Sequence, residues 1–197
     1  MLTPLPLTDW KTVFRKRAKA MRKEAAARHP NAARFAASHF MLHFAPNERA
    51  AIAIYHAHGD ELDTAPLADA LMRDGHAILL PVVVEKNAPL LFRLWEVDKP
   101  LAEGAYGIPA PGEDAPAMRP DIVVVPLLGV RPDGARLGMG GGFYDRTLEQ
   151  LRSEGEILAI GYGYGAQRMD RFPVGPHDQF LDGFVHENGA DRIDRRR

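Results

Sequence analysis

Cysteine is missing from this chain of 197 residues. Its absence excludes a disulfide framework, a thiol nucleophile and a zinc or iron–sulfur site held by thiolates. An excess of one charge is also missing, because 25 basic and 26 acidic residues leave a formal net charge of −1. Neither nucleic acid nor an anionic membrane is therefore expected as a partner.

Long hydrophobic runs are missing as well. One of the longest covers residues 77–84, which is far shorter than the ~20 residues that a membrane-spanning helix needs. The N-terminal residues 1–17 lack the basic and then apolar pattern of a signal peptide. These absences predict a soluble protein located in the cytoplasm.

Helical and strand-like patterns alternate along the rest of the chain. Two helices are predicted over residues 9–28 and 32–44, with Asp9 as the N-cap of the first and His29-Pro30 as its end. Further helices are predicted over residues 63–74 and 144–154, and apolar strands over residues 50–55, 77–84, 90–95, 122–128 and 157–162. Residues 99–120 predict a loop, because proline and glycine are dense there.

This alternation predicts an α/β fold with a mainly parallel sheet. The strands are continuous apolar runs, which favours burial on both faces of the sheet. We expect a single domain over residues 1–190 and a polar tail over residues 191–197 that frays.

The most informative segment is RLGMGGGFYDR, residues 136–146, which lies between a predicted strand and a predicted helix. Its glycine cluster, residues 138–142, can present several backbone N–H groups to a phosphate, and the dipole of the following helix favours an anion there. The Gly-Lys-Ser/Thr ending of a Walker A loop is absent, and the spacing of the third glycine does not fit a Rossmann fingerprint. A flexible turn without a ligand is the alternative for the glycines alone.

Residues that flank the glycines favour a nucleotide site. Arg136 can pair with a phosphate through two N–H groups, and Asp145 is placed to hold Mg²⁺ beside it. Phe143 and Tyr144 offer aromatic surface for a ring, although core packing explains one of the two. Asp178 becomes a second Mg²⁺ ligand if the fold brings it to Asp145; otherwise it is a turn or cap aspartate.

Two weaker clusters lie nearer the N-terminus. Lys11 and Arg15 are four residues apart, so they share a helix face and can reach a triphosphate together; a solvated basic face is the alternative. Glu61 and Asp63 follow the predicted strand at residues 50–55. We assign a ligand role to Glu61 and a helix-capping role to Asp63.

Together these clusters resemble the 5-formyltetrahydrofolate cyclo-ligase family, also called methenyltetrahydrofolate synthetases. The strongest match is residues 136–146 with the preceding VVVPLLGVRPDG. The Lys11-x-x-x-Arg15 helix, the DELDT stretch at residues 60–64, the GIPAPGE loop at residues 107–113 and the Pro-His-Asp cluster at residues 176–178 occur in the expected order. The resemblance therefore spans about residues 11–187.

The resemblance implies a three-layer α/β/α, Rossmann-like fold whose topology is similar to that of sugar-phosphate isomerases and coenzyme A transferases. It implies ATP as co-substrate, bound by Lys11, Arg15, Arg136, Leu137, Gly138, Met139, Gly140, Gly141, Gly142, Phe143 and Tyr144. It implies 5-formyltetrahydrofolate and its polyglutamates as substrate, bound by Glu61, His56, Tyr106, Met139, Gly140, Gly141, Gly142 and Phe143. Asp145 and Asp178 match the Mg²⁺ ligands. Some relatives carry a basic residue where Met139 and Gly141 stand, so more of the phosphate charge here falls on Arg136, Lys11, Arg15 and Mg²⁺.

The implied reaction needs no side-chain nucleophile. The formyl oxygen attacks the γ-phosphate of ATP, the nitrogen at position 10 closes the ring, and phosphate leaves. Two alternatives remain at this point. One is a paralogue that binds a nucleotide or pterin without ligase activity, and the other is an isomerase or transferase on a similar scaffold that does not use ATP.

Overall fold

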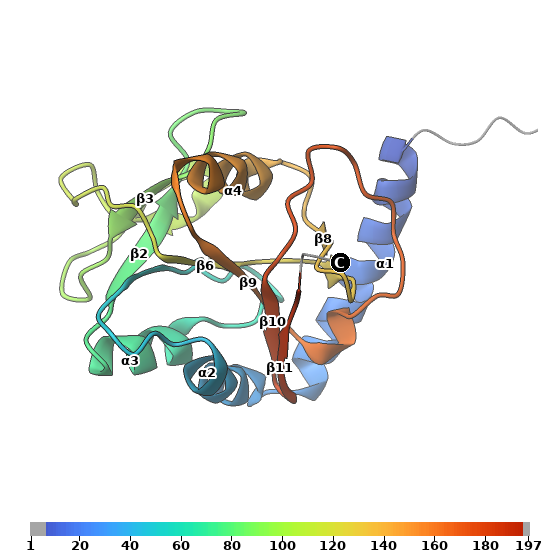
Figure 1. Cartoon of the computed structure of the whole chain (residues 1–197), viewed down its shortest axis with the longest axis horizontal. Coiled ribbons are helices and arrows are strands. Elements are labelled where there is room, and N and C mark those ends of the chain that lie inside the picture. The colour runs from blue at the N-terminus through green and yellow to red at the C-terminus, as the bar shows by residue number, and fades with distance from the viewer. Residues whose placement is uncertain (1–6, 195–197) are drawn as a thin grey trace, which may run out of the picture.

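A computed structural model describes residues 7–194 of the chain. Within these residues a seven-stranded sheet runs in the order β11-β10-β9-β6-β1-β2-β3 (Figure 1). The inner strands are mutually parallel: β1 (Ala51–Ala53), β2 (Ala77–Val82), β6 (Ile122–Val125), β9 (Leu158–Tyr162) and β10 (Gly183–His186). The two edge strands, β3 (Leu91–Leu94) and β11 (Gly189–Arg192), are antiparallel to their neighbours. The prediction of a mainly parallel sheet is confirmed.

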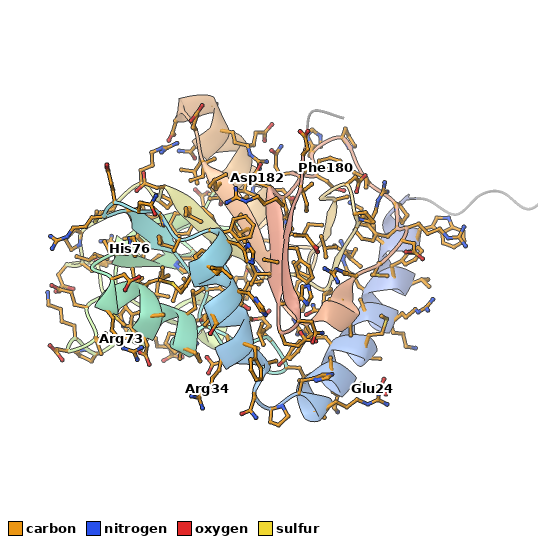
Figure 2. The ribbon with its side chains drawn as sticks, turned by 60° about the horizontal axis from the view of Figure 1, so that its bottom comes forward. Glu24, Arg34, Arg73, His76, Phe180 and Asp182 are labelled. Atoms are coloured by element: carbon orange, nitrogen blue, oxygen red, sulfur yellow. The ribbon has the colours of Figure 1, made fainter. Side chains whose placement is uncertain are left out.

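Helices cover both faces of this sheet (Figures 1 and 2). Helices α2 (Ala32–His43) and α3 (Ala65–Arg73) lie on one face, and α4 (Phe143–Glu154) lies on the other. Successive strand residues point to opposite faces, so Ile52 packs with the α2–α3 side whereas Ala53 packs with Leu148 of α4. The predicted three-layer α/β/α fold is confirmed.

Helix α1 (Leu7–Arg28) runs beside the sheet next to a small hairpin of β7 (Gly129–Val130) and β8 (Arg136–Leu137). It ends one residue before the predicted stop at His29-Pro30. Because the helix is already described from Leu7, Asp9 lies inside it, and the prediction of Asp9 as its N-cap is wrong. The N-cap of the helix that begins at Ala65 is Thr64, so the prediction of Asp63 as the cap is wrong by one residue, although Asp63 accepts the N–H of Ala65 at 3.0 Å.

Two predicted boundaries also need correction. The strand expected over residues 122–128 ends at Val125, because Pro126 has no N–H to continue the ladder. The expected loop over residues 99–120 contains a hairpin built from β4 (Ala102–Glu103), the 3₁₀ turn η1 (Ala105–Gly107) and β5 (Pro109–Ala110). We call residues 102–110 the cap hairpin.

The C-terminal segment is more ordered than its composition predicts. Strands β10 and β11 were not predicted, and Asp191 and Arg192 of the expected tail pair with β10. Arg192 also donates to the carbonyl of His43 and lies over the ring of Phe44. Fraying is therefore wrong for residues 191 and 192, while residues 195–197 lie outside the described part. Among the residues that the structure describes, no helix is long and apolar enough to cross a membrane.

Candidate functional site

A cavity of about 240 Å³ lies at the carboxyl ends of the inner strands. Its walls are the segments that follow β1, β2 and β6, the glycine cluster with the start of α4, and the cap hairpin. Open α/β sheets bind ligands at this edge. The structure therefore gathers the predicted glycine cluster, Glu61, His56 and Tyr106 around one space.

The glycine cluster, residues 138–142, leads directly into the N-terminus of α4. Gly140 and Gly142 have φ of 106° and 68°, a conformation that favours glycine. A Cβ atom at Gly140 would also lie 3.2 Å from Cζ of Arg15. The first N–H groups of α4 point outwards from the N-terminus of the helix, which is a favourable place for an anion to bind.

The predicted cations approach the cluster from two sides. Nε of Arg15 on α1 donates to the carbonyl of Gly138 at 2.9 Å. Arg136 on β8 lines the cavity, and its guanidinium lies 5.8 Å from the centre of the Tyr144 ring. Leu137 is different, because its side chain is buried in a core cluster with Leu128 and can offer the cavity only its backbone.

The two predicted metal ligands are both close to α4. Asp145 lies in its first turn and accepts the backbone N–H of Gln179 at 3.1 Å, so the segment that carries Asp178 reaches the same place. Each carboxylate pairs with a cation: Asp145 with Arg136 at 2.9 Å and Asp178 with Lys11 at 2.8 Å. No group of three or more His, Cys, Asp or Glu side chains in the described residues could hold a metal. Two carboxylates fit Mg²⁺, which takes its remaining ligands from phosphate and water.

Glu61 reaches the cavity with both of its oxygens engaged. Oε1 accepts from Nη1 of Arg22 at 3.3 Å, and Oε2 accepts the N–H of His58 at 3.0 Å. Burial, and next the charge of Glu61, raise the pKa of Tyr55 and of Tyr144 well above the usual tyrosine value. Tyrosines are protonated at neutral pH even without such a shift, and the hydroxyl of Tyr55 donates to the carbonyl of Leu62 at 2.7 Å.

Aromatic side chains form another part of the cavity lining. Tyr106, at the tip of the cap hairpin, has a φ of 60°, which is uncommon for a bulky residue. Its ring meets the ring of Phe143 edge-on, with 6.1 Å between centroids. His56 and Met139 are exposed at the cavity lining. These contacts place aromatic surface in the lining of the same cavity as Glu61.

Two arginines at this site were not singled out from the sequence. Arg22 lies seven residues after Arg15, and this helical spacing was the available signal for its role at Glu61. Arg146 donates to the carbonyl of Gly141 at 2.9 Å, and its guanidinium lies 5.2 Å from the centre of the Phe143 ring. Arg146 thus fixes the glycine cluster from the α4 side.

The fold and the site define an α/β protein with a ligand cavity beside a glycine-rich helix start. The model of the 5-formyltetrahydrofolate cyclo-ligase family matches residues 7–187, so the chain belongs to this family. The 5-formyltetrahydrofolate cyclo-ligase of Escherichia coli K12 is 34% identical over 139 residues, which are 68% of this chain and 76% of that protein. The predictions of the family and of an enzyme are confirmed.

Solved structures are similar over most of the chain. The NMR structure of 5,10-methenyltetrahydrofolate synthetase from Aquifex aeolicus has a TM-score of 0.76 at 23% identity and covers 95% of this chain, which itself covers 93% of that one. The corresponding synthetase from Mycoplasma pneumoniae has a TM-score of 0.64 at 21% identity, with coverage of 86% and 98%. At these identities the likeness shows the fold.

Proposed function

We propose that the protein converts 5-formyltetrahydrofolate and ATP into 5,10-methenyltetrahydrofolate, ADP and phosphate. The observation that carries the proposal is one cavity that joins a glycine-rich helix start, Arg136 and Glu61, in a chain that matches the family over residues 7–187. The proposal includes the polyglutamates of this folate as substrates and a cytoplasmic location, both of which the family resemblance implies.

Each ligand is assigned the side of the cavity whose chemistry fits it. The triphosphate lies at residues 138–142, where backbone N–H groups, Arg136, Lys11 and Arg15 offset its charge. The pterin lies in the part of the cavity lined by Glu61, Tyr106 and Phe143, with its N–H groups donating to Glu61 and its ring beside the two aromatic side chains. This arrangement directs the formyl group towards the terminal phosphate.

The reaction then proceeds in two steps. The formyl oxygen forms a bond to the γ-phosphorus as the bond to ADP breaks, which turns a poor leaving oxygen into a good one. The nitrogen at position 10 attacks the formyl carbon, loses its proton, and closes the five-membered ring as phosphate leaves with the formyl oxygen. The protein positions the two reactants and neutralises phosphate charge.

Mg²⁺ belongs to the proposal as the partner of the phosphates. Asp145 and Asp178 would hold it, and it would supply further neutralisation of charge on the phosphate oxygens. The side chains Arg136 and Lys11, which pair with these carboxylates, would then contact the triphosphate.

The test is a spectrophotometric assay of purified protein with 5-formyltetrahydrofolate, ATP and Mg²⁺, which follows the near-ultraviolet absorbance of the methenyl product. We expect a rise that needs all three additions. Asp145→Asn should abolish it, whereas Asp191→Asn, a change on the distant strand β11, should retain it. No rise with ATP or folate still bound would indicate an inactive paralogue, and no binding of either would favour the isomerase-like alternatives.

A further inference from the structure

Most of the cations assigned to the phosphates already have an anionic partner inside the protein. Nζ of Lys11 lies 2.8 Å from Oδ1 of Asp178, and Arg136 lies 2.9 Å from Asp145. These pairs are largely shielded from water, because their side chains are 16% and 19% exposed in the first and 5% and 23% exposed in the second. Solvent therefore weakens them less than surface pairs.

The two pairs belong to one connected network. Asp178 also accepts the N–H of Gly175 at 2.7 Å, which fixes its carboxylate beside Lys11. The next residue, Gln179, donates its N–H to Asp145 at 3.1 Å. Both carboxylates are thus held in position by the same short segment, residues 175–179.

This network opposes a triphosphate that arrives alone. A phosphate that contacts Lys11 competes with Asp178 for the ammonium group and places added negative charge beside a partly buried carboxylate. A divalent cation that arrives with the nucleotide gives the displaced carboxylates a new partner. Resting on the proposed function, we infer that Asp178 is an internal competitor of the nucleotide for Lys11, so that the site rejects ATP without its metal and accepts ATP with it.

The opposite role for Asp178 predicts the opposite result. If the pair only holds Lys11 in place for the phosphate, loss of the carboxylate charge weakens nucleotide binding with or without metal. If Asp178 competes, loss of that charge strengthens binding of ATP without metal. Asp178→Asn distinguishes them, because the amide retains an oxygen for the N–H of Gly175 but loses the negative charge.

The experiment measures ATP binding by calorimetry, without folate, in EDTA and in excess MgCl₂. We expect Asp178→Asn to bind ATP about three- to tenfold more tightly than the unmodified protein in EDTA. The gain in affinity that Mg²⁺ gives should be smaller in the variant. Asp191→Asn removes the same charge from another pair, with Arg168, and should leave both values unchanged.

Equal or weaker binding of ATP by Asp178→Asn in EDTA would overturn the inference. Asp145→Asn repeats the test through Arg136, if the first variant does not fold. If the unmodified protein binds ATP but forms no methenyl product, the proposed function is contradicted, whereas the comparison of ATP binding between the variants still tests the inference. Absence of ATP binding under both conditions would overturn both proposals.

Discussion

The Arg22–Glu61 pair gives a sharp test of how the cavity is held together. Arg22 is 8% exposed, and its Nη1 reaches Oε1 of Glu61 at 3.3 Å. Nε of the same guanidinium is buried with no hydrogen-bond partner in the described residues. Glu61→Ala therefore leaves a buried cation without its anion, which is more costly than loss of an ordinary contact.

The size of the effect follows from the burial and the distance. Breaking a fully buried pair by removing one partner costs roughly 3–5 kcal/mol. Here the hydrogen bond is long, and the side chains of Arg22 and Glu61 are 10% and 16% exposed, so some water screens the cation. We therefore expect Glu61→Ala to lower the free energy of unfolding by about 2 kcal/mol. Arg22→Met in the same background should restore about 1 kcal/mol of it, because no unpaired cation remains.

The assay is urea unfolding followed by circular dichroism, with the single and double variants compared as a cycle. Glu24→Ala is the matched control, because Glu24 pairs with Arg28 on the same helix, is exposed and points away from the sheet in Figure 2. Glu24→Ala should lower the free energy of unfolding by less than about 0.5 kcal/mol. A loss of similar size for Glu61→Ala, or strictly additive effects of Arg22→Met and Glu61→Ala, would refute the reasoning.

Two further predictions concern buried polar groups. Burial lowers the pKa of His186 below its usual value of 6.5, so the folded protein favours the neutral imidazole. The contribution of His186 to stability should therefore be fully present above about pH 6.5 and should decline as the pH falls through the lower pKa of the folded state. His186→Gln should flatten this decline in urea midpoints measured from pH 8 to pH 5; an equally steep decline would contradict the assignment. Thr147 accepts the N–H of Leu90, a residue of the cavity wall, at 2.8 Å and donates to Phe143 at 2.7 Å. Thr147→Val should cost about 1–2 kcal/mol and raise the KM for folate more than it lowers kcat; unchanged KM and stability would count against it.

The predictions from sequence succeeded where one physical signal dominated. Continuous apolar runs are sufficient to find β1, β2, β6 and β9, because a parallel strand covered by helices must be apolar on both faces. Glycines at a strand-to-helix connection are sufficient to find the glycine-rich turn before α4, because φ values such as 106° at Gly140 favour glycine.

The predictions failed where the outcome depended on contacts between distant segments. Strand β11 is polar, and it is held by pairing with β10 and by the contact of Arg192 with His43, neither of which its own composition signals. The cap hairpin pairs only Ala102 with Ala110 and Glu103 with Pro109, which is too short a pattern for periodicity to reveal. Arg22 was passed over, because a basic residue on a basic helix predicts a solvated face until its partner Glu61 is known.

Helix α1 shows why local sequence underestimates the site. Residues 11, 15, 18, 22 and 25 recur every three or four positions, so they form one stripe. Ala18 and Ala25 of that stripe are buried, whereas Lys11, Arg15 and Arg22 make polar contacts with three separate segments of the chain. Phe14 of α1 also packs against the core cluster that contains Leu128 and Leu137, so apolar packing and these polar contacts together position the helix. Lys11 and Arg15, which are proposed to receive the phosphates, therefore also hold α1 against the site. The amino-acid composition of the helix alone does not distinguish their binding role from their structural role.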